Sequence, residues 1–389
     1  NNRLILLSSF IWIYRSNYLT FIEYNNCMKQ IVIVGGGLAG ITAAQQLTQR
    51  KQCHNYSITI IDAGSDIATQ TSYANAGRFC PTSLALGSPS QGSGIQRTLL
   101  PDLIKTTLLP LPMFDMHAPY QHHMQVNFTR PTLLYWGICN LFLQNKDRSK
   151  IGHRLLANLA LDNMNALLSK FSPIHKSQMN IRPGTLYLYN DNDHLNKGKE
   201  KAKKVQESTM KHLSMKALTT QETVSRFPWL QQWKAASNNS GVSLPLKARI
   251  PGSVYVSSDW SADAREFLMG VVETMKLSKT NINYVFNTKV RWIDGNSIRV
   301  CNVQDGSERV IEADVIVLAC GVHTNKLIPN GQRRLPMEGM RGFSIDLTGC
   351  EMNQNGFKNG ELPNVAIADY SSADLNFQIT PFEHGRLRM

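Results

Sequence analysis

Near the start of the chain, apolar residues occur in continuous runs and at helical spacing, and these two patterns predict a strand, a helix and a second strand. Residues 30–34 (QIVIV) are apolar and β-branched at both parities, which is typical of a strand buried on both faces of a parallel sheet. Residues 38–50 place apolar side chains at helical spacing, and residues 57–62 (SITIID) predict the next strand. The order predicts one β-α-β unit.

The middle of the chain has mixed patterns. Residues 151–171 predict a helix, and the alternating segment 184–189 (GTLYLY) predicts a strand. Thr219 and Glu222 have the spacing of a capping box, so we expect a helix to begin there.

Short strands with tight turns dominate from residue 282 onward. The dipeptides Asp294-Gly295 and Asp305-Gly306 are strong hairpin signals, because the central residues of such turns need positive φ. Residues 282–312 therefore predict an antiparallel meander. The meander leads into residues 313–321 (ADVIVLACG), which predict another buried strand ending in glycine.

The first 27 residues differ from the rest. They contain an 11-residue apolar run (LILLSSFIWIY) preceded by Arg3, which is too short to span a bilayer. We interpret residues 1–27 as a leader, with the run as the core of a targeting peptide, or as an extension without a structural role.

Composition narrows the class of partner. The chain has 389 residues, which favours two domains, and a formal net charge of +13. Part of the basic excess lies in residues 197–216, which lack aromatic residues for stacking on bases, so we interpret them as a solvated helix face rather than a nucleic-acid site. The seven cysteines form no C-x-x-C pair, which argues against a disulfide framework or a zinc site and favours a reducing compartment.

Three glycines between the first strand and the first helix predict a dinucleotide site. Gly35, Gly37 and Gly40 spell G-x-G-x-x-G, in which they serve a tight turn, close approach of a pyrophosphate, and helix–strand packing, respectively. The phosphates then lie at the helix N-terminus. Asp62, 22 residues after Gly40, ends the second strand where an acid binds ribose hydroxyls. A glycine-rich turn without a ligand is the alternative, and the full context makes it the weaker one.

Residues 69–83 (TQTSYANAGRFCPTS) carry a narrower resemblance. They resemble the ETSxANAG segment of D-amino-acid dehydrogenases, in the D-amino-acid oxidase-like group of FAD-dependent oxidoreductases. Residues 184–189, 313–327 and 334–347 resemble further segments of that group in the same order, from Met28 to near the C-terminus. No second G-x-G-x-x-G follows a strand, so a separate NADPH domain is not expected.

The resemblance implies an α/β fold. It consists of a Rossmann-like, GR2-type FAD-binding domain with an antiparallel meander (28–95 and 255–335) and an α+β substrate domain (96–254 and 336–389). It also implies FAD as cofactor, with these cofactor-binding residues: Gly35, Gly37, Gly40, Asp62, Thr71, Ser72, Asn75, Ala76, Gly77, Val290, Ala319 and Gly321. Ser72 and Asn75 have the alternative role of satisfying a turn, and Val290 that of a core residue.

The chain departs from the family pattern at two places. Residues 78–80 (Arg-Phe-Cys) replace small or polar residues, and the sequence ends at QITPFEHGRLRM, before segments that hold substrate in the family. We therefore expect a fragment without its C-terminal part. Arg386 and Arg388 are candidates for the substrate carboxylate, with a surface or strand-edge role as the alternative, and the catalytic residues stay unassigned. No metal site is expected.

The implied reaction is oxidative deamination of D-amino acids to keto acids and ammonia, with electrons passed to a quinone or carrier. Two alternatives stay open: a glycine- or sarcosine-type amine oxidase that uses oxygen, and an inactive truncated protein that binds FAD. We expect a small-molecule amino-acid substrate, no nucleic acid, and a cytoplasmic or organellar (including mitochondrial) location that allows peripheral membrane contact.

Overall fold

The structure is a computed structural model that divides into two compact units, each described by itself. The first unit comprises residues 1–75, 170–178 and 264–339; the second comprises residues 76–169, 179–263 and 340–389. The described residues are 4–6, 29–49, 56–82, 146–189, 191–207, 213–230, 251–278, 280–329, 335, 344–347, 363–369, 377–382 and 386–389. The domain boundaries expected from the sequence stay a prediction.

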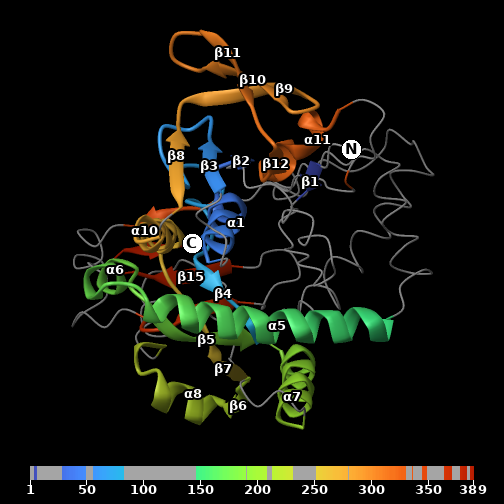
Figure 1. Ribbon diagram of the computed structural model, residues 1–389. Helices are drawn as coiled ribbons and strands as arrows, with labels where there is room; N and C mark the ends of the chain where they lie inside the picture. Colours follow the sequence, from blue (N-terminus) through green and yellow to red (C-terminus); the bar gives the residue numbers. More distant parts are fainter. Residues whose placement is uncertain are drawn as a thin grey trace, which may run out of the picture. The chain divides into compact units, whose positions relative to one another are not determined.

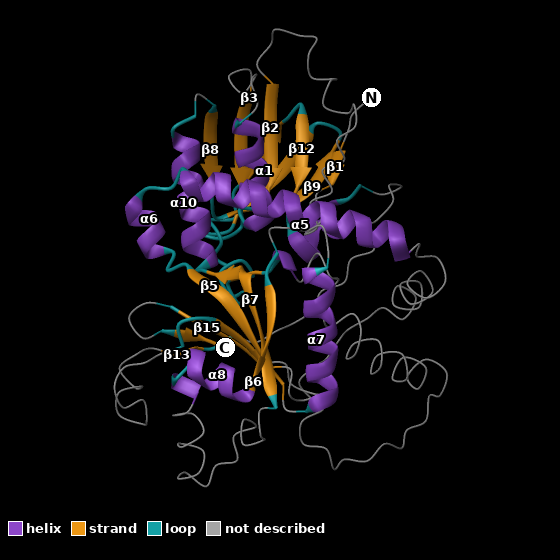
Figure 2. Cartoon of the chain, turned by 90° about the horizontal axis from the view of Figure 1, so that it is seen from below, coloured by secondary structure: helices purple, strands orange, loops and turns teal. Residues whose placement is uncertain are grey.

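A parallel sheet forms the centre of the first unit, with strand order β1-β12-β2-β3-β8 (Figures 1 and 2). The predicted β-α-β unit is confirmed as β2 (Lys29–Val34), α1 (Leu38–Thr48) and β3 (Tyr56–Ile61). The other strands are β1 (Leu4–Leu6), β8 (Asn281–Val285) and β12 (Val315–Leu318). A backbone segment of the expected leader, β1, thus pairs with β12.

The meander is shorter than the sequence indicates. It comprises β9 (Thr288–Asp294), β10 (Ser297–Asn302) and β11 (Glu308–Glu312), with Gly295 and Gly306 at positive φ in its two turns. Residues 282–285, expected at the start of the meander, belong instead to β8, which pairs in parallel with β3. The alternating pattern of residues 281–285 fits either sheet, and only the pairing with β3 decides between them.

The parallel sheet is covered on both faces, as its apolar strands require. On one face Val32, Val34 and Leu318 pack against meander residues such as Val290 and Ile298. On the other face α1 packs over Ile33, and α1 contacts α10 (Ala264–Lys276), which in turn contacts α6 (Pro173–Gln178). A 3-10 turn (Gly321–His323) and α11 (Thr324–Leu327) follow β12.

The second unit contains a mixed sheet with strand order β13-β16-β15-β14-β5-β7-β4, and β6 pairs with β7. Its long central strands are β5 (Arg182–Tyr189) and β7 (Gly252–Ser261). The remaining strands are β4 (Arg78–Phe79), β6 (Met215–Thr219), β13 (Asp346–Leu347), β14 (Ala366–Asp369), β15 (Phe377–Pro381) and β16 (Leu387–Arg388).

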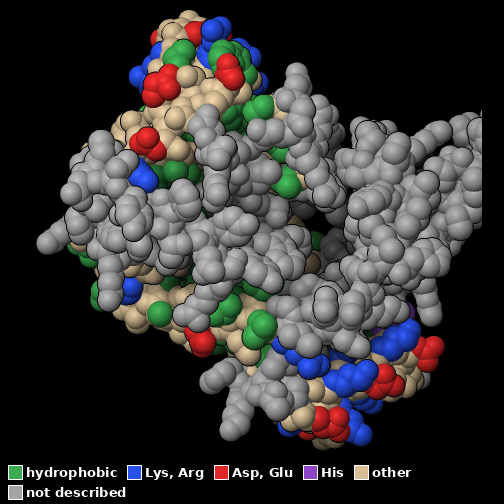
Figure 3. Space-filling view, turned by 45° about the vertical axis from the view of Figure 1, so that its right-hand side comes forward, with side chains coloured by type: hydrophobic (Ala, Val, Ile, Leu, Met, Phe, Trp, Pro, Cys, Tyr) green, Lys and Arg blue, Asp and Glu red, His purple; other side chains and the backbone are tan. Residues whose placement is uncertain are grey.

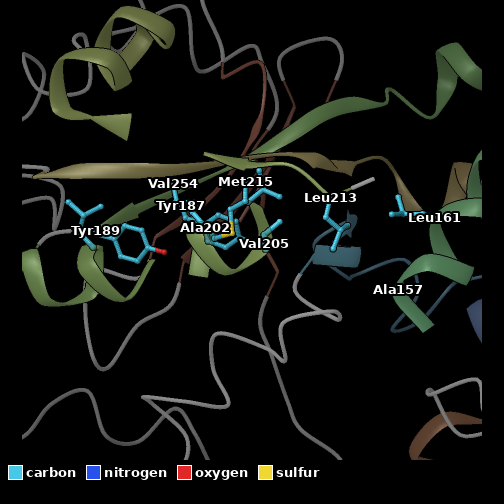
Figure 4. Packing of buried hydrophobic residues seen from close by; sticks show 12 residues of the cluster. Ala157, Leu161, Tyr187, Tyr189, Ala202, Val205, Leu213, Met215 and Val254 are labelled. Carbon is cyan, nitrogen blue, oxygen red and sulfur yellow. The ribbon is translucent and has the colours of Figure 1, made fainter. Parts of the chain in front are cut away.

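Helices cover both faces of this mixed sheet. Residues of α5 (Lys146–Ser169) and α7 (Asn192–Gln206) share a core cluster with Tyr187 and Val254 (Figure 4). On the other face, Leu186, Leu188 and Tyr255 pack with Phe227 and Trp229, which follow α8 (Thr220–Arg226).

The predicted capping box is confirmed at the start of α8. Thr219 and Glu222 exchange side-chain and backbone hydrogen bonds there. The basic run begins on α7, whose buried positions are Leu195, Gly198, Ala202 and Val205 and whose lysines are mostly exposed, among acidic side chains (Figure 3). This arrangement agrees with a solvated helix face.

Candidate functional site

The loop between β2 and α1 contains three glycines. At two of them any side chain would overlap the protein backbone. Gly35 has φ +115°, and a Cβ added there would lie 2.4 Å from the carbonyl oxygen of Ala319. A Cβ at Gly40 would lie 1.8 Å from the carbonyl oxygen of Gly35. Both distances are far below any real Cβ contact, so these glycines allow α1 and β12 to approach the loop.

Gly37 is different, because the surrounding protein leaves room for a Cβ there. Its φ is −83°, which any residue adopts, and an added Cβ would meet only the flexible Ser72 Oγ, at 3.0 Å. The space that a Cβ would fill lies at the N-terminus of α1, where free backbone N–H groups and the helix dipole favour an anion. The loop therefore fits a dinucleotide pyrophosphate approaching the backbone at Gly37.

Asp62 follows β3 and holds the loop in shape through both carboxylate oxygens. Oδ2 accepts a hydrogen bond from the backbone N–H of Gly36 at 2.6 Å, and Oδ1 accepts one from Gly64 at 2.7 Å. The side chain is half-buried. The acid expected to bind ribose thus lies directly beside the glycine loop.

The segment with the narrow family resemblance reaches the same helix end. Ser72 Oγ accepts a hydrogen bond from the backbone N–H of Leu38 at 3.0 Å, although α1 has no side-chain cap at Gly37. Thr71 is exposed, and Asn75 is half-buried. Ser72 thus accepts from a backbone donor at the N-terminus of α1, and both its predicted contact with FAD and its alternative role in a turn stay predictions.

The end of β12 approaches the loop from the neighbouring strand. The Ala319 N–H donates to the carbonyl oxygen of Val34 at 2.8 Å. The Cys320 thiol donates to the same oxygen at 3.1 Å, and burial raises its pKa to about 12, so the thiol stays neutral. Gly321 has φ +55° and opens the 3-10 turn. Val290 is buried in the core of the meander, in agreement with its alternative role.

Ala76 and Gly77 belong to the second unit, where the backbone fixes them tightly. The carbonyl oxygen of Ala76 accepts a hydrogen bond from Thr380 Oγ1, and that of Gly77 accepts one from the Ala262 N–H at 2.8 Å. A Cβ at Gly77 would lie 2.2 Å from the carbonyl oxygen of Ala262. The structure therefore brings together, within the first unit, six of the predicted residues: Gly35, Gly37, Gly40, Asp62, Ser72 and Ala319.

The two candidate arginines for a substrate carboxylate both hold protein carboxylates. Arg386 pairs with Asp263. Arg388 is only 1% exposed and donates from Nε and Nη2 to the two oxygens of Asp346 at 2.7 and 2.8 Å. These hydrogen bonds lower the pKa of Asp346. Both arginines thus pair with a protein carboxylate, and their candidacy for the substrate carboxylate stays a prediction.

Comparison with known proteins decides the family. The profile described as FAD dependent oxidoreductase (DAO) matches residues 30–389. The chain belongs to this family. FAD is therefore its cofactor, in agreement with the geometry of the glycine loop.

Curated relatives of this DAO-family chain are named D-amino acid dehydrogenase. The protein from Vibrio cholerae serotype O1 (strain M66-2) is 22% identical over 323 residues, which cover 82% of this chain and 67% of the relative. D-amino acid dehydrogenase 2 from Ralstonia nicotianae is 25% identical over 347 residues, which cover 87% of this chain and 71% of the relative.

Solved structures share the fold. Glycine oxidase from Geobacillus kaustophilus superposes with a TM-score of 0.52 at 14% identity, over 92% of this chain and 70% of that one. L-amino acid deaminase from Proteus vulgaris has a TM-score of 0.50 at 14% identity, over 93% of this chain and 60% of that one.

Among the described residues of this DAO-family chain there is neither a cluster of side chains for a metal ion nor a helix that could span a membrane. Its described residues contain no group of three or more His, Cys, Asp or Glu side chains that could hold a metal ion. Among the described helices, none has the length and apolar character needed to cross a bilayer.

Proposed function

We propose that the protein oxidises D-amino acids to imino acids, which hydrolyse to keto acids and ammonia. One observation carries the choice of substrate: the curated relatives that match more than four fifths of the chain are named D-amino acid dehydrogenase. The family assignment supplies the FAD-dependent oxidoreductase chemistry.

The proposal gives the predicted cofactor-binding residues distinct roles. The loop backbone at Gly37 and the N-terminus of α1 bind the pyrophosphate, and Asp62 binds the adenosine ribose while it orients the loop through Gly36. The Ser72 hydroxyl accepts a hydrogen bond from the first N–H of α1, at the same helix end where the phosphates bind. Thr71, Asn75, Ala76 and Gly77 line the ring end, and Val290, Ala319 and Gly321 complete the cofactor site.

Bound FAD supplies a two-electron acceptor for the hydride that leaves the substrate Cα. The amino group must be neutral for its lone pair to form the C=N bond, and the protein favours that form by burying the amine near a cation. Water then adds to the imino acid and releases ammonia. The two electrons pass on to a quinone or carrier, and because quinones are lipid-soluble, we include peripheral contact with a membrane in the proposal.

An enantiomer panel with product analysis tests this reaction. The purified protein is given FAD, an artificial quinone and matched D- and L-amino acids, and keto acid and ammonia are measured. We expect equal amounts of both products from D-amino acids only. Turnover of L-amino acids instead would contradict the proposal.

The acceptor is tested separately. Glycine-oxidase-type chemistry, suggested by the shared fold with glycine oxidase, is the competing function. It predicts glycine turnover with hydrogen peroxide formation in air and no gain from added quinone. The proposed dehydrogenase predicts turnover that depends on the quinone.

A further inference from the structure

Residues 66–68 connect the glycine loop to helix α10, and all three segments belong to the first unit. The Ala68 N–H donates a hydrogen bond to the carbonyl oxygen of Gly36 at 3.1 Å. The carbonyl oxygen of Ile67, in the same peptide group as that N–H, accepts one from Arg265 Nε at 3.4 Å, near the long limit of a hydrogen bond. One peptide group thus joins α10 to the loop that we expect to hold the pyrophosphate.

The peptide groups in this connection point in one direction. The described part of the chain has no cis peptide bond, and in a planar trans peptide the C=O and N–H groups point in opposite directions. The Gly36 carbonyl faces Ala68, so the N–H of Gly37, in the same peptide group, faces away from it. That N–H lies at the start of α1, where free N–H groups favour an anion. Two aligned peptide groups therefore run from the Arg265 cation to the predicted phosphate position.

The carboxylate of Asp66 holds Arg265 in this arrangement. Arg265 Nη2 and Asp66 Oδ2 lie 2.6 Å apart, and the two side chains are 33% and 39% exposed. The other carboxylate oxygen, Oδ1, accepts a hydrogen bond from the Ile67 N–H at 2.7 Å. Because a partly exposed ion pair contributes little to global stability, its main effect is local: it directs the guanidinium at the backbone of residues 66–68.

The backbone at Ala68 has an unfavourable conformation. Its φ is +56°, a left-handed value that alanine rarely adopts, and the residue is 3% exposed. Strain of this kind persists only where the surrounding structure fixes the backbone. The hydrogen bonds to Gly36 and from Arg265 hold the peptide group of Ile67 and Ala68 at both ends, and in this conformation the Ala68 N–H faces the glycine loop.

We propose that Arg265 strengthens the binding of the FAD pyrophosphate from a distance, through the two aligned peptide groups. The inference rests on the proposed placement of the pyrophosphate at Gly37. Hydrogen bonds in a chain polarise one another, so a cation at the carbonyl end makes the N–H at the far end a better donor to an anion. The same contacts order the glycine loop before FAD binds, which lowers the cost of ordering it on binding. Arg265 is thus a positioning residue, and Asp66 is its anchor.

The variants separate the connection through the backbone from direct repulsion and from folding. Arg265→Met removes the guanidinium, and Arg265→Lys keeps the charge without the planar fork. A double variant, Arg265→Met with Asp66→Asn, also removes the carboxylate that would otherwise repel an anion once its arginine is gone. The matched control is Lys276→Met, which deletes another cation of α10 together with its ion pair to Glu273.

FAD affinity is measured by quenching of flavin fluorescence, and the pyrophosphate is observed by phosphorus NMR of bound FAD. Arg265→Met should weaken FAD binding roughly 3- to 10-fold, the size expected for one hydrogen bond, and should shift the phosphorus resonances. Arg265→Lys should recover part of the affinity, the double variant should stay weakened, and Lys276→Met should match the wild type. Without FAD, the Tm of Arg265→Met should fall no further than that of Lys276→Met. A purely structural role would lower the Tm instead and leave the phosphorus resonances unchanged.

Gly37→Ala serves as the reference for the pyrophosphate site. If Gly37→Ala weakens FAD binding and Arg265→Met does not, the inference is wrong and the placement of the pyrophosphate stands. Wild-type affinity in the double variant would assign any loss in Arg265→Met to repulsion by Asp66 and would also overturn the inference, even if Arg265→Met alone does not fold. If neither Gly37→Ala nor Arg265→Met changes FAD affinity, the placement at Gly37 is wrong and the inference falls with it.

Discussion

Alanine substitutions at Gly37 and Gly40 should separate what the fold demands from what the ligand demands. At Gly40 the new Cβ would lie 1.8 Å from the carbonyl oxygen of Gly35, more than 1 Å inside the closest contact that real Cβ atoms make. The carbonyl group of Gly35 is part of the backbone and cannot rotate away from the new Cβ as a side chain could, so α1 would have to shift away from β2. At Gly37 the new Cβ would meet only Ser72 Oγ, at 3.0 Å, and that side chain can rotate.

The magnitudes follow from these contacts. Overpacking of a core costs about 1–3 kcal/mol, and the depth of the Gly40 clash places it near the upper value. For a domain of this size, about 3 kcal/mol lowers the Tm by roughly 6–12 °C. Gly37→Ala loses at most the hydrogen bond between Ser72 and Leu38, about 1 kcal/mol, or roughly 2–4 °C.

The assay measures stability and FAD binding on the same preparations. Protein freed of FAD is melted by circular dichroism, and FAD affinity is measured by quenching of flavin fluorescence. We expect Gly40→Ala to lose stability without FAD, and Gly37→Ala to stay folded while its FAD affinity falls by an order of magnitude or more. Wild-type FAD affinity in Gly37→Ala, or equal losses of Tm in the two variants, would refute the reasoning.

Three further predictions concern single groups. Asp62→Asn leaves an amide oxygen that can replace one of the two charged acceptors for the loop N–H groups, so FAD affinity should fall about tenfold or more in a fluorescence titration, and an unchanged affinity would contradict the assigned role. Asp346→Asn leaves the buried Arg388 cation with a neutral partner and should cost about 2–3 kcal/mol in denaturant unfolding at about pH 7, less than in a fully buried pair because Asp346 is partly exposed. Hydrogen bonds from Arg388 lower the folded-state pKa of Asp346 from its usual value of 3.8, so the stabilisation is complete above that value and is lost as the pH falls through the folded-state pKa. The stability difference between the variant and the wild type should therefore shrink as the solution is acidified below that usual value, and a difference that does not shrink on acidification would count against the ion pair. Cys80 and Cys320, whose pKa values burial raises to about 12, should stay unlabelled by a thiol reagent at neutral pH until the protein unfolds, as peptide mass spectrometry will detect; rapid labelling of the native protein would disprove this.

Local signals made the start of the fold predictable. The apolar strand, the glycine loop and the helix spacing each act over a few residues, and they placed β2, α1 and β3 within two residues of their observed bounds. The capping box at Thr219 and Glu222 was predictable for the same reason, because both of its hydrogen bonds span three residues.

Long-range pairing could not be predicted from the same patterns. Residues 281–285 join the parallel sheet through β3, more than two hundred residues earlier in the sequence. The burial of Arg388 depends on Asp346 in a neighbouring strand. The contacts of Arg265 with Asp66 and Ile67 likewise join positions almost two hundred residues apart, so no local pattern could indicate them.

The central claim is that this chain binds FAD and uses it to oxidise D-amino acids. The most direct measurement is the visible spectrum of the purified, FAD-loaded protein under anaerobic conditions, before and after D-alanine and then L-alanine are added to separate samples. The account predicts a flavin spectrum that D-alanine bleaches and L-alanine leaves unchanged. A bound flavin that neither a panel of D-amino acids nor glycine bleaches would contradict the claim, and bleaching by L-alanine or glycine alone would reassign the substrate.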